Sequence, residues 1–287
     1  MTNSDALTRS FKHLIANPKL FIPDLVLIAV SYLMLYLIYL YTGVGDILTL
    51  LQNASDIPIL EVLKNYIIQN LPEVIISFVI FVIVTFFLGV GVIVMRFEMI
   101  KDILKTGNSS LRKAWKAHRS YFWSVVFLRL LIFLISIIAL GVVFLGSGLF
   151  YLILNPFSTN LALSISAVIA ILLTMVLVLL IKFAIMFRYP IMFLKGKKNS
   201  WKILKDAITF FKKDPLFVII TWAIIFLVGL AFSILGSGLG LLSSAFSSFI
   251  TVSIILTVLV SIINILIDLS AELWGAIYLF DKFNSKK

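Results

Sequence analysis

The chain has 287 residues, 62% of them hydrophobic, and carries a net charge of +11. A soluble globular domain is usually only about 45–50% apolar, so the composition excludes that class. There is no cysteine, which excludes disulfides, thiolate metal ligands and cysteine nucleophiles.

Six long apolar runs follow one another along the chain. Each has about the 20 residues that a helix needs to cross roughly 30 Å of hydrocarbon. The sequence therefore predicts an all-α membrane protein with a single membrane domain over residues 1–287. Its six transmembrane helices are expected at about 21–42, 73–95, 122–145, 161–187, 216–236 and 249–274.

A short basic segment precedes the first, third and fifth runs, and each begins with a serine: Ser10, Ser110 and Ser200. Serine is a good helix cap, and the apolar residues that follow recur at helical spacing among Lys and Arg. Such amphipathic helices can lie flat at the headgroup boundary with their apolar side toward the lipid. In the third segment that side comprises Trp201, Leu204, Ala207, Ile208 and Phe211.

A proline marks where two of these segments turn into the membrane. Pro18 and Pro215 each disfavour helical geometry in the preceding residue. The second segment has no proline at this point, so a turn between its amphipathic helix and the following run has weaker support.

A Gly-x-Gly ends three of the apolar runs, at 43–45, 146–148 and 236–238. Glycine commonly follows the end of a helix, so these pairs are interpreted as helix ends on the outer side of the membrane. A second interpretation is a re-entrant segment, because further apolar residues follow each pair. The sequence leaves both open.

The last two glycine pairs also indicate an internal repeat. They lie in identical Leu-Gly-Ser-Gly-Leu stretches 90 residues apart, and the same offset separates Ser110 from Ser200. A fixed period of this kind predicts repeated structural units. Each unit is expected to be an interfacial amphipathic helix followed by a helical hairpin, over residues 5–107, 108–198 and 199–287.

The positive charge lies almost entirely on one side of this predicted topology. Of the 24 Lys and Arg, 22 lie on the side of the termini, in the terminal segments, in the loops on that side and, for Lys182, near the end of the fourth run. This distribution predicts that both termini are cytoplasmic, in a multi-pass protein of the plasma membrane. The basic rim is expected to contact anionic lipid headgroups rather than nucleic acid. Its candidate residues are Lys12, Arg112, Lys113, Lys116, Lys197, Lys198, Lys202 and Lys205.

A polar stripe runs along the last apolar run. Thr257, Ser261, Asn264, Asp268 and Glu272 recur every three or four residues and so share one face of a helix. A carboxylate inside a membrane is costly, which favours a position facing the helix bundle or a hydrated cavity.

The function of this stripe stays open between three interpretations: a substrate- or proton-handling site, a structural ion pair, and placement at the membrane interface. Possible partners for its acids are Arg96 and Arg188, at the inner ends of the second and fourth spans. The candidate site residues are Asn264, Asp268, Glu272, Arg129 and Lys182.

No motif indicates an enzyme. The two histidines, His13 and His118, lie in basic segments and fit surface positions, and there is no metal-binding or nucleophile motif. No catalytic residue, metal or cofactor is predicted.

Three stretches carry a resemblance to a known group. They are residues 6–21 with Asn-Pro-Lys-Leu-Phe, 89–115 with Ser-Leu-Arg-Lys-Ala-Trp, and 201–217 with Asp-Pro-Leu-Phe. Together they resemble uncharacterised six-span prokaryotic membrane proteins and the membrane domain of some glycerophosphodiester phosphodiesterases. The phosphodiesterase catalytic domain has no counterpart here, so the resemblance implies the membrane fold and no hydrolytic activity.

These features lead to two functional hypotheses. The first is a non-enzymatic membrane protein that handles a lipid or another hydrophobic substrate, as a transporter or an accessory subunit. The second is a membrane scaffold or assembly module that binds protein partners through its basic cytoplasmic rim.

Overall fold

The structure is a computed structural model of the whole chain. It describes residues 3–42, 64, 68, 70–156, 158–245 and 250–286, with the side chains of 242–245 and 250–254 left aside. Helices are the only regular structure in these residues. In chain order they are α1 (Asn3–Ala16), the 3-10 helix η1 (Pro18–Phe21), α2 (Ile22–Thr42), α5 (Leu71–Thr106), α6 (Leu111–Leu154), α7 (Thr159–Ile185), α8 (Arg188–Leu194), α9 (Ser200–Lys213), α10 (Pro215–Ala245) and α11 (Ile250–Ser285).

Six of the helical segments in the described residues are long and apolar enough to cross a membrane. They contain α2, α5, α6, α7, α10 and α11, in the order that the six apolar runs predict. The chain is therefore a polytopic helical membrane protein, and the predicted fold class is confirmed at this level.

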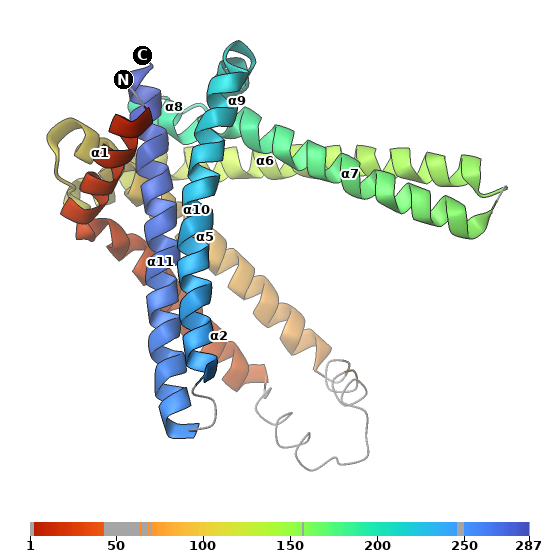
Figure 1. Cartoon of the computed structure of the whole chain (residues 1–287), viewed down its shortest axis with the longest axis horizontal. Coiled ribbons are helices and arrows are strands. Elements are labelled where there is room, and N and C mark those ends of the chain that lie inside the picture. The colour runs from red at the N-terminus through yellow and green to blue at the C-terminus, as the bar shows by residue number, and fades with distance from the viewer. Residues whose placement is uncertain are drawn as a thin grey trace.

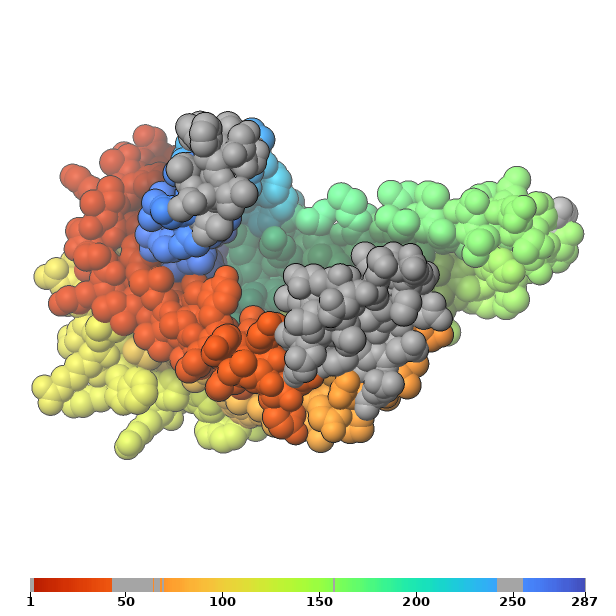
Figure 2. Space-filling model, turned by 90° about the horizontal axis from the view of Figure 1, so that it is seen from below, coloured from red at the N-terminus to blue at the C-terminus, as the bar shows by residue number. Residues whose placement is uncertain are grey.

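The six long helices pair into three hairpins, α2 with α5, α6 with α7 and α10 with α11. Figure 1 shows that these hairpins diverge from a common base, where α1, α8, α9 and both termini lie. Seen from below, the α6–α7 hairpin projects away from the rest of the molecule (Figure 2). The outer parts of the hairpins expose large apolar side chains, such as Leu33, Phe144, Leu172 and Ile234. Extended apolar surface of this kind suits contact with lipid.

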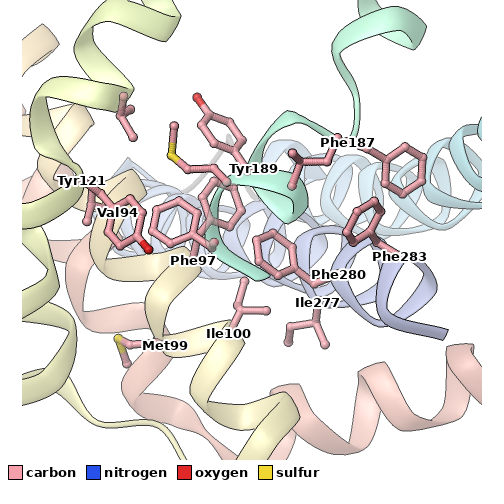
Figure 3. Packing of buried hydrophobic residues seen from close by; sticks show 14 of the residues in the cluster. Val94, Phe97, Met99, Ile100, Tyr121, Phe187, Tyr189, Ile277, Phe280 and Phe283 are labelled. Atoms are coloured by element: carbon pink, nitrogen blue, oxygen red, sulfur yellow. The ribbon is translucent and has the colours of Figure 1, made fainter. Parts of the chain in front are cut away.

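The buried core lies in the base rather than along the hairpins. Phe97 of α5 is at its centre, with ring-centroid distances of 4.6 Å to Tyr189 of α8, 5.1 Å to Phe280 of α11 and 5.8 Å to Phe193 of α8. Figure 3 shows Phe97, Tyr189 and Phe280 converging between these helices. Tyr121 of α6 in turn contacts Phe193 at 4.8 Å, so aromatic packing joins the three hairpins at one end.

The amphipathic helices α1 and α9 cover this base. In α9 the apolar residues Ile203, Leu204 and Ala207 are buried, and in α1 Phe11 stacks on Trp274 of α11 at 5.2 Å. The sequence predicted that these apolar sides face the lipid. This expectation needs correction, because the apolar residues named here pack against the apolar base of the bundle. Ile15 of α1 and Trp201 of α9 stay exposed.

Only one of the three predicted serine caps is present. Ser110 accepts a hydrogen bond from the Lys113 backbone N–H at 3.4 Å. Ser10 lies inside α1 and donates to the Ala6 carbonyl, and Ser200 donates to the Ser124 carbonyl of α6 at 2.8 Å. Asn199 caps α9 instead, one residue earlier than predicted.

The second amphipathic segment is not a separate helix. It continues into the third span as α6, a single helix of 44 residues, about 66 Å long at 1.5 Å per residue. No proline interrupts it, in contrast to the breaks at Pro18 and Pro215.

The last two glycine pairs lie inside helices. Residues 146–148 are within α6, which ends at Leu154, and 236–238 are within α10. Neither predicted role, helix end or re-entrant segment, is therefore correct for these copies. A helix tolerates glycine at a cost of about 1 kcal/mol each, whereas unpaired backbone in an apolar setting costs several times more. The first pair, 43–45, lies outside the described residues.

Gly107 is the residue at which α5 ends. It follows α5 with φ 78°, and its N–H donates to the Ile103 carbonyl at 2.8 Å. A side chain would have free space there, but the left-handed backbone disfavours any Cβ. Gly107→Ala is therefore expected to lower the free energy of unfolding by about 1–2 kcal/mol, measured by SDS titration in mixed micelles.

Gly146→Ala is the matched control for Gly107. It lies inside α6, where an added Cβ meets nothing within 4 Å. The same substitution is expected to be neutral or to stabilise the protein by up to about 1 kcal/mol. Equal losses at both glycines would contradict the proposed role of the positive φ.

Candidate functional site

A cavity of about 880 Å³ opens among the three hairpins, beside the aromatic core. Its walls come from α5, α6, α7, α8, α10 and α11, and most of the lining side chains are apolar, including Ile132, Phe133, Leu177 and Phe226. The volume is within the usual range of about 300–1,000 Å³ for sites that bind small molecules. A cavity with such walls suits a ligand with a hydrocarbon part.

Four cationic side chains line the same cavity, one on each of four helices. They are Arg96 of α5, Arg129 of α6, Lys182 of α7 and Arg188 of α8, and the lining includes a single carboxylate, Glu272 of α11. The cavity is therefore apolar in its walls and positive in its charge.

Arg96 is the most firmly held of the four. Its Nε donates to Asp24 Oδ2 at 3.1 Å and its Nη2 donates to Asp24 Oδ1, which makes a bidentate pair. Its Nη1 donates to Glu272 Oε1 at 2.5 Å. Asp24 is only 3% exposed. Arg96 thus ties α5 to α2 and to α11.

The other three cations contact aromatic rings, and one of them also donates to a backbone carbonyl. Arg129 lies 5.5 Å from the Phe86 ring and Lys182 lies 5.8 Å from the Trp222 ring. Arg188 lies 4.5 Å from the Tyr189 ring and donates to the Ile185 carbonyl at 3.0 Å. Cation–π contacts hold these groups without neutralising them.

These three cations have no carboxylate partner among the described residues. The buried Nε of Arg188 also has no hydrogen-bond acceptor there. The cavity therefore offers positive charge to an anionic group.

The predicted polar stripe divides into residues with different surroundings. Glu272 lines the cavity and pairs with Arg96. Asn264 faces α10, where its Oδ1 lies 3.0 Å from the place that a Cβ on Gly236 would occupy. Asp268 is exposed and does not line the cavity. Ser261 donates to the carbonyl of Thr257 in its own helix.

Of the five candidate site residues, the structure brings together Arg129, Lys182 and Glu272 around one cavity and leaves Asn264 and Asp268 outside its lining. Asp24 is the residue that sequence reasoning missed. It is the only acidic residue in the first apolar run, and that isolation was the available signal.

The rim residues lie on the base of the molecule. Seven of the eight candidates are exposed, namely Lys12, Arg112, Lys113, Lys116, Lys198, Lys202 and Lys205. Lys197 is partly covered and pairs with Asp206 of α9. The rim and the cavity are thus two distinct groups of cations, one on the base of the molecule and one lining the cavity.

His118 lies among aromatic side chains of α6. His118 stacks between Trp115 and Phe122 on α6, with ring-centroid distances of 5.7 and 4.8 Å. Within the part of the chain that the structure describes, no three His, Asp or Glu side chains come together to form a metal site.

Comparisons with protein-family models, with curated proteins and with solved structures find no match to this chain. The resemblance to the membrane domain of glycerophosphodiester phosphodiesterases therefore stays a prediction, and function is argued from the cavity and its charges.

Proposed function

We propose that this membrane protein binds a lipid with an anionic headgroup in the cavity among its hairpins, as a transporter or as an accessory subunit. The observation that carries the proposal is the combination of apolar walls with Arg129, Lys182 and Arg188, three cations without a carboxylate partner in the described residues. Acyl chains match the walls, and a phosphate matches the guanidinium and ammonium donors.

We further propose a topology with both termini cytoplasmic in the plasma membrane. The termini come together at the base, where Arg9 of α1 pairs with Asp281 of α11 at 2.9 Å. The exposed rim cations belong to the same end of the molecule, as the positive-inside rule requires of a cytoplasmic side. The three hairpins that share this base support a threefold internal repeat.

The proposal is tested by removing two cavity charges. Arg129→Gln with Lys182→Gln is expected to weaken binding of phosphatidylglycerol about thirtyfold, since each cation near a headgroup contributes about 1 kcal/mol. Dissociation constants are measured by native mass spectrometry of protein titrated with phosphatidylglycerol in neutral detergent. Phosphatidylcholine serves as the zwitterionic reference lipid.

The matched control removes two charges from the rim. Lys202 and Lys205 are exposed on α9 and do not line the cavity. Lys202→Gln with Lys205→Gln is expected to leave the dissociation constant within about twofold, because exposed charges are screened beyond roughly 10 Å. Equal losses in the two double variants would contradict a cavity site.

The scaffold alternative is favoured by one observation, the exposed rim itself. If the protein is a scaffold, the rim variant is expected to lose its protein partners while the cavity variant keeps them. Translocation of labelled phosphatidylglycerol in reconstituted vesicles then separates a transporter from an accessory subunit that only binds lipid.

A further inference from the structure

The two carboxylates that contact Arg96 hold it in unequal ways. Asp24 is 3% exposed, accepts two hydrogen bonds and does not line the cavity. Glu272 is 60% exposed, accepts one hydrogen bond through Oε1, and lines the cavity. One partner of Arg96 is therefore structural, and the other faces the place where a ligand binds.

Glu272 occupies a donor nitrogen of Arg96 that a phosphate can also use. A guanidinium binds carboxylate and phosphate oxygens with similar geometry. Asp24 already takes Nε and Nη2, so Nη1 is the side of the Arg96 fork that Glu272 holds toward the cavity. A phosphate oxygen that approaches Arg96 Nη1 from the cavity therefore competes with Glu272 Oε1 for this side of the guanidinium.

We propose that Glu272 is an exchangeable counter-ion, which the phosphate of the bound lipid displaces from Arg96. This inference rests on the proposed lipid-binding function. The displaced carboxylate stays next to the bound phosphate because its backbone is fixed in α11, and the two negative groups repel each other. Glu272 therefore lowers the affinity of the cavity for anionic lipid and favours release.

The direction of the effect separates this role from a direct contact. A residue that binds lipid loses affinity when its charge is removed, whereas a competing counter-ion gains it. A half-exposed ion pair contributes about 0.2–1 kcal/mol, so its loss corresponds to a roughly 1.4- to fivefold change in the dissociation constant.

Glu272→Gln is therefore expected to bind phosphatidylglycerol roughly 1.4- to fivefold more tightly than the unmodified protein. The measurement is the same titration by native mass spectrometry, with phosphatidylcholine binding unchanged. Glu272→Asp shortens the reach to Arg96 and is expected to bind with intermediate affinity, which gives a second variant if the glutamine protein folds poorly.

Asp268→Asn is the matched control, because Asp268 lies one turn away on α11, is exposed and does not line the cavity. The dissociation constant of this variant for phosphatidylglycerol is expected to stay unchanged. Binding to Glu272→Gln that is equal to or weaker than binding to the unmodified protein would overturn the counter-ion role and leave the lipid site standing. Failure of the unmodified protein to prefer phosphatidylglycerol would overturn the proposed function and the counter-ion role together.

Discussion

Asp24→Asn is expected to lower the free energy of unfolding by about 3–5 kcal/mol, because it leaves the Arg96 charge without its buried partner. Asp24 is 3% exposed and accepts from two nitrogens of Arg96. The remaining contact, to the half-exposed Glu272, compensates for little of this loss. Equilibrium unfolding in SDS mixed micelles measures the difference.

A double replacement separates the structural role of this pair from its role in binding. Apolar residues of similar volume often replace a buried ion pair without loss of stability. Asp24→Leu with Arg96→Met is thus expected to recover most of the stability lost by Asp24→Asn. The same double variant is expected to bind phosphatidylglycerol weakly, because Arg96 lines the cavity. A small loss for Asp24→Asn alone would contradict the assignment of a buried structural pair.

Phe97→Ala is expected to cost about 3–5 kcal/mol of unfolding free energy, the usual range for deleting a buried aromatic ring. Phe97 is 8% exposed and contacts aromatic rings of α8 and α11 from its place on α5. Its loss removes the packing that joins the hairpins at the base. The shape of the cavity is expected to change as well, since Phe97 forms part of its lining.

Phe78→Ala is the control for this change. Phe78 lies on the same helix, α5, but is 65% exposed on the outer part of the hairpin. Its replacement is expected to change stability by less than about 0.5 kcal/mol. A comparable loss at both positions would mean that the base does not hold the bundle together.

The sequence was sufficient to predict the membrane-spanning helices, because each is indicated by a continuous apolar run of neighbouring residues. Six continuous apolar runs each match the thickness of a bilayer, and the described residues form six helices of spanning length in the same order. Helix ends were less predictable. The glycine pairs at 146–148 and 236–238 continue as helix, because the apolar residues around them favour an unbroken backbone ladder.

The candidate site was predicted in part. The spacing of Asn264, Asp268 and Glu272 puts them on one face of α11, but spacing does not show what lies opposite each turn of that face. One turn meets α10, another meets Arg96, and Asp268 between them is exposed. Asp24 was missed because its partner, Arg96, lies on the other helix of the same hairpin, 72 residues away in the chain.

By itself, therefore, the sequence determined the class of protein, the number of membrane helices and the separation of basic from apolar surface. Composition and periodicity act along a single helix, so they report these properties directly. Only the tertiary structure decided that Arg96 lies between Asp24 and Glu272 and that four cations share one apolar cavity. These contacts depend on how the hairpins pack at the base, and Glu272 meets Arg96 across 176 residues of chain.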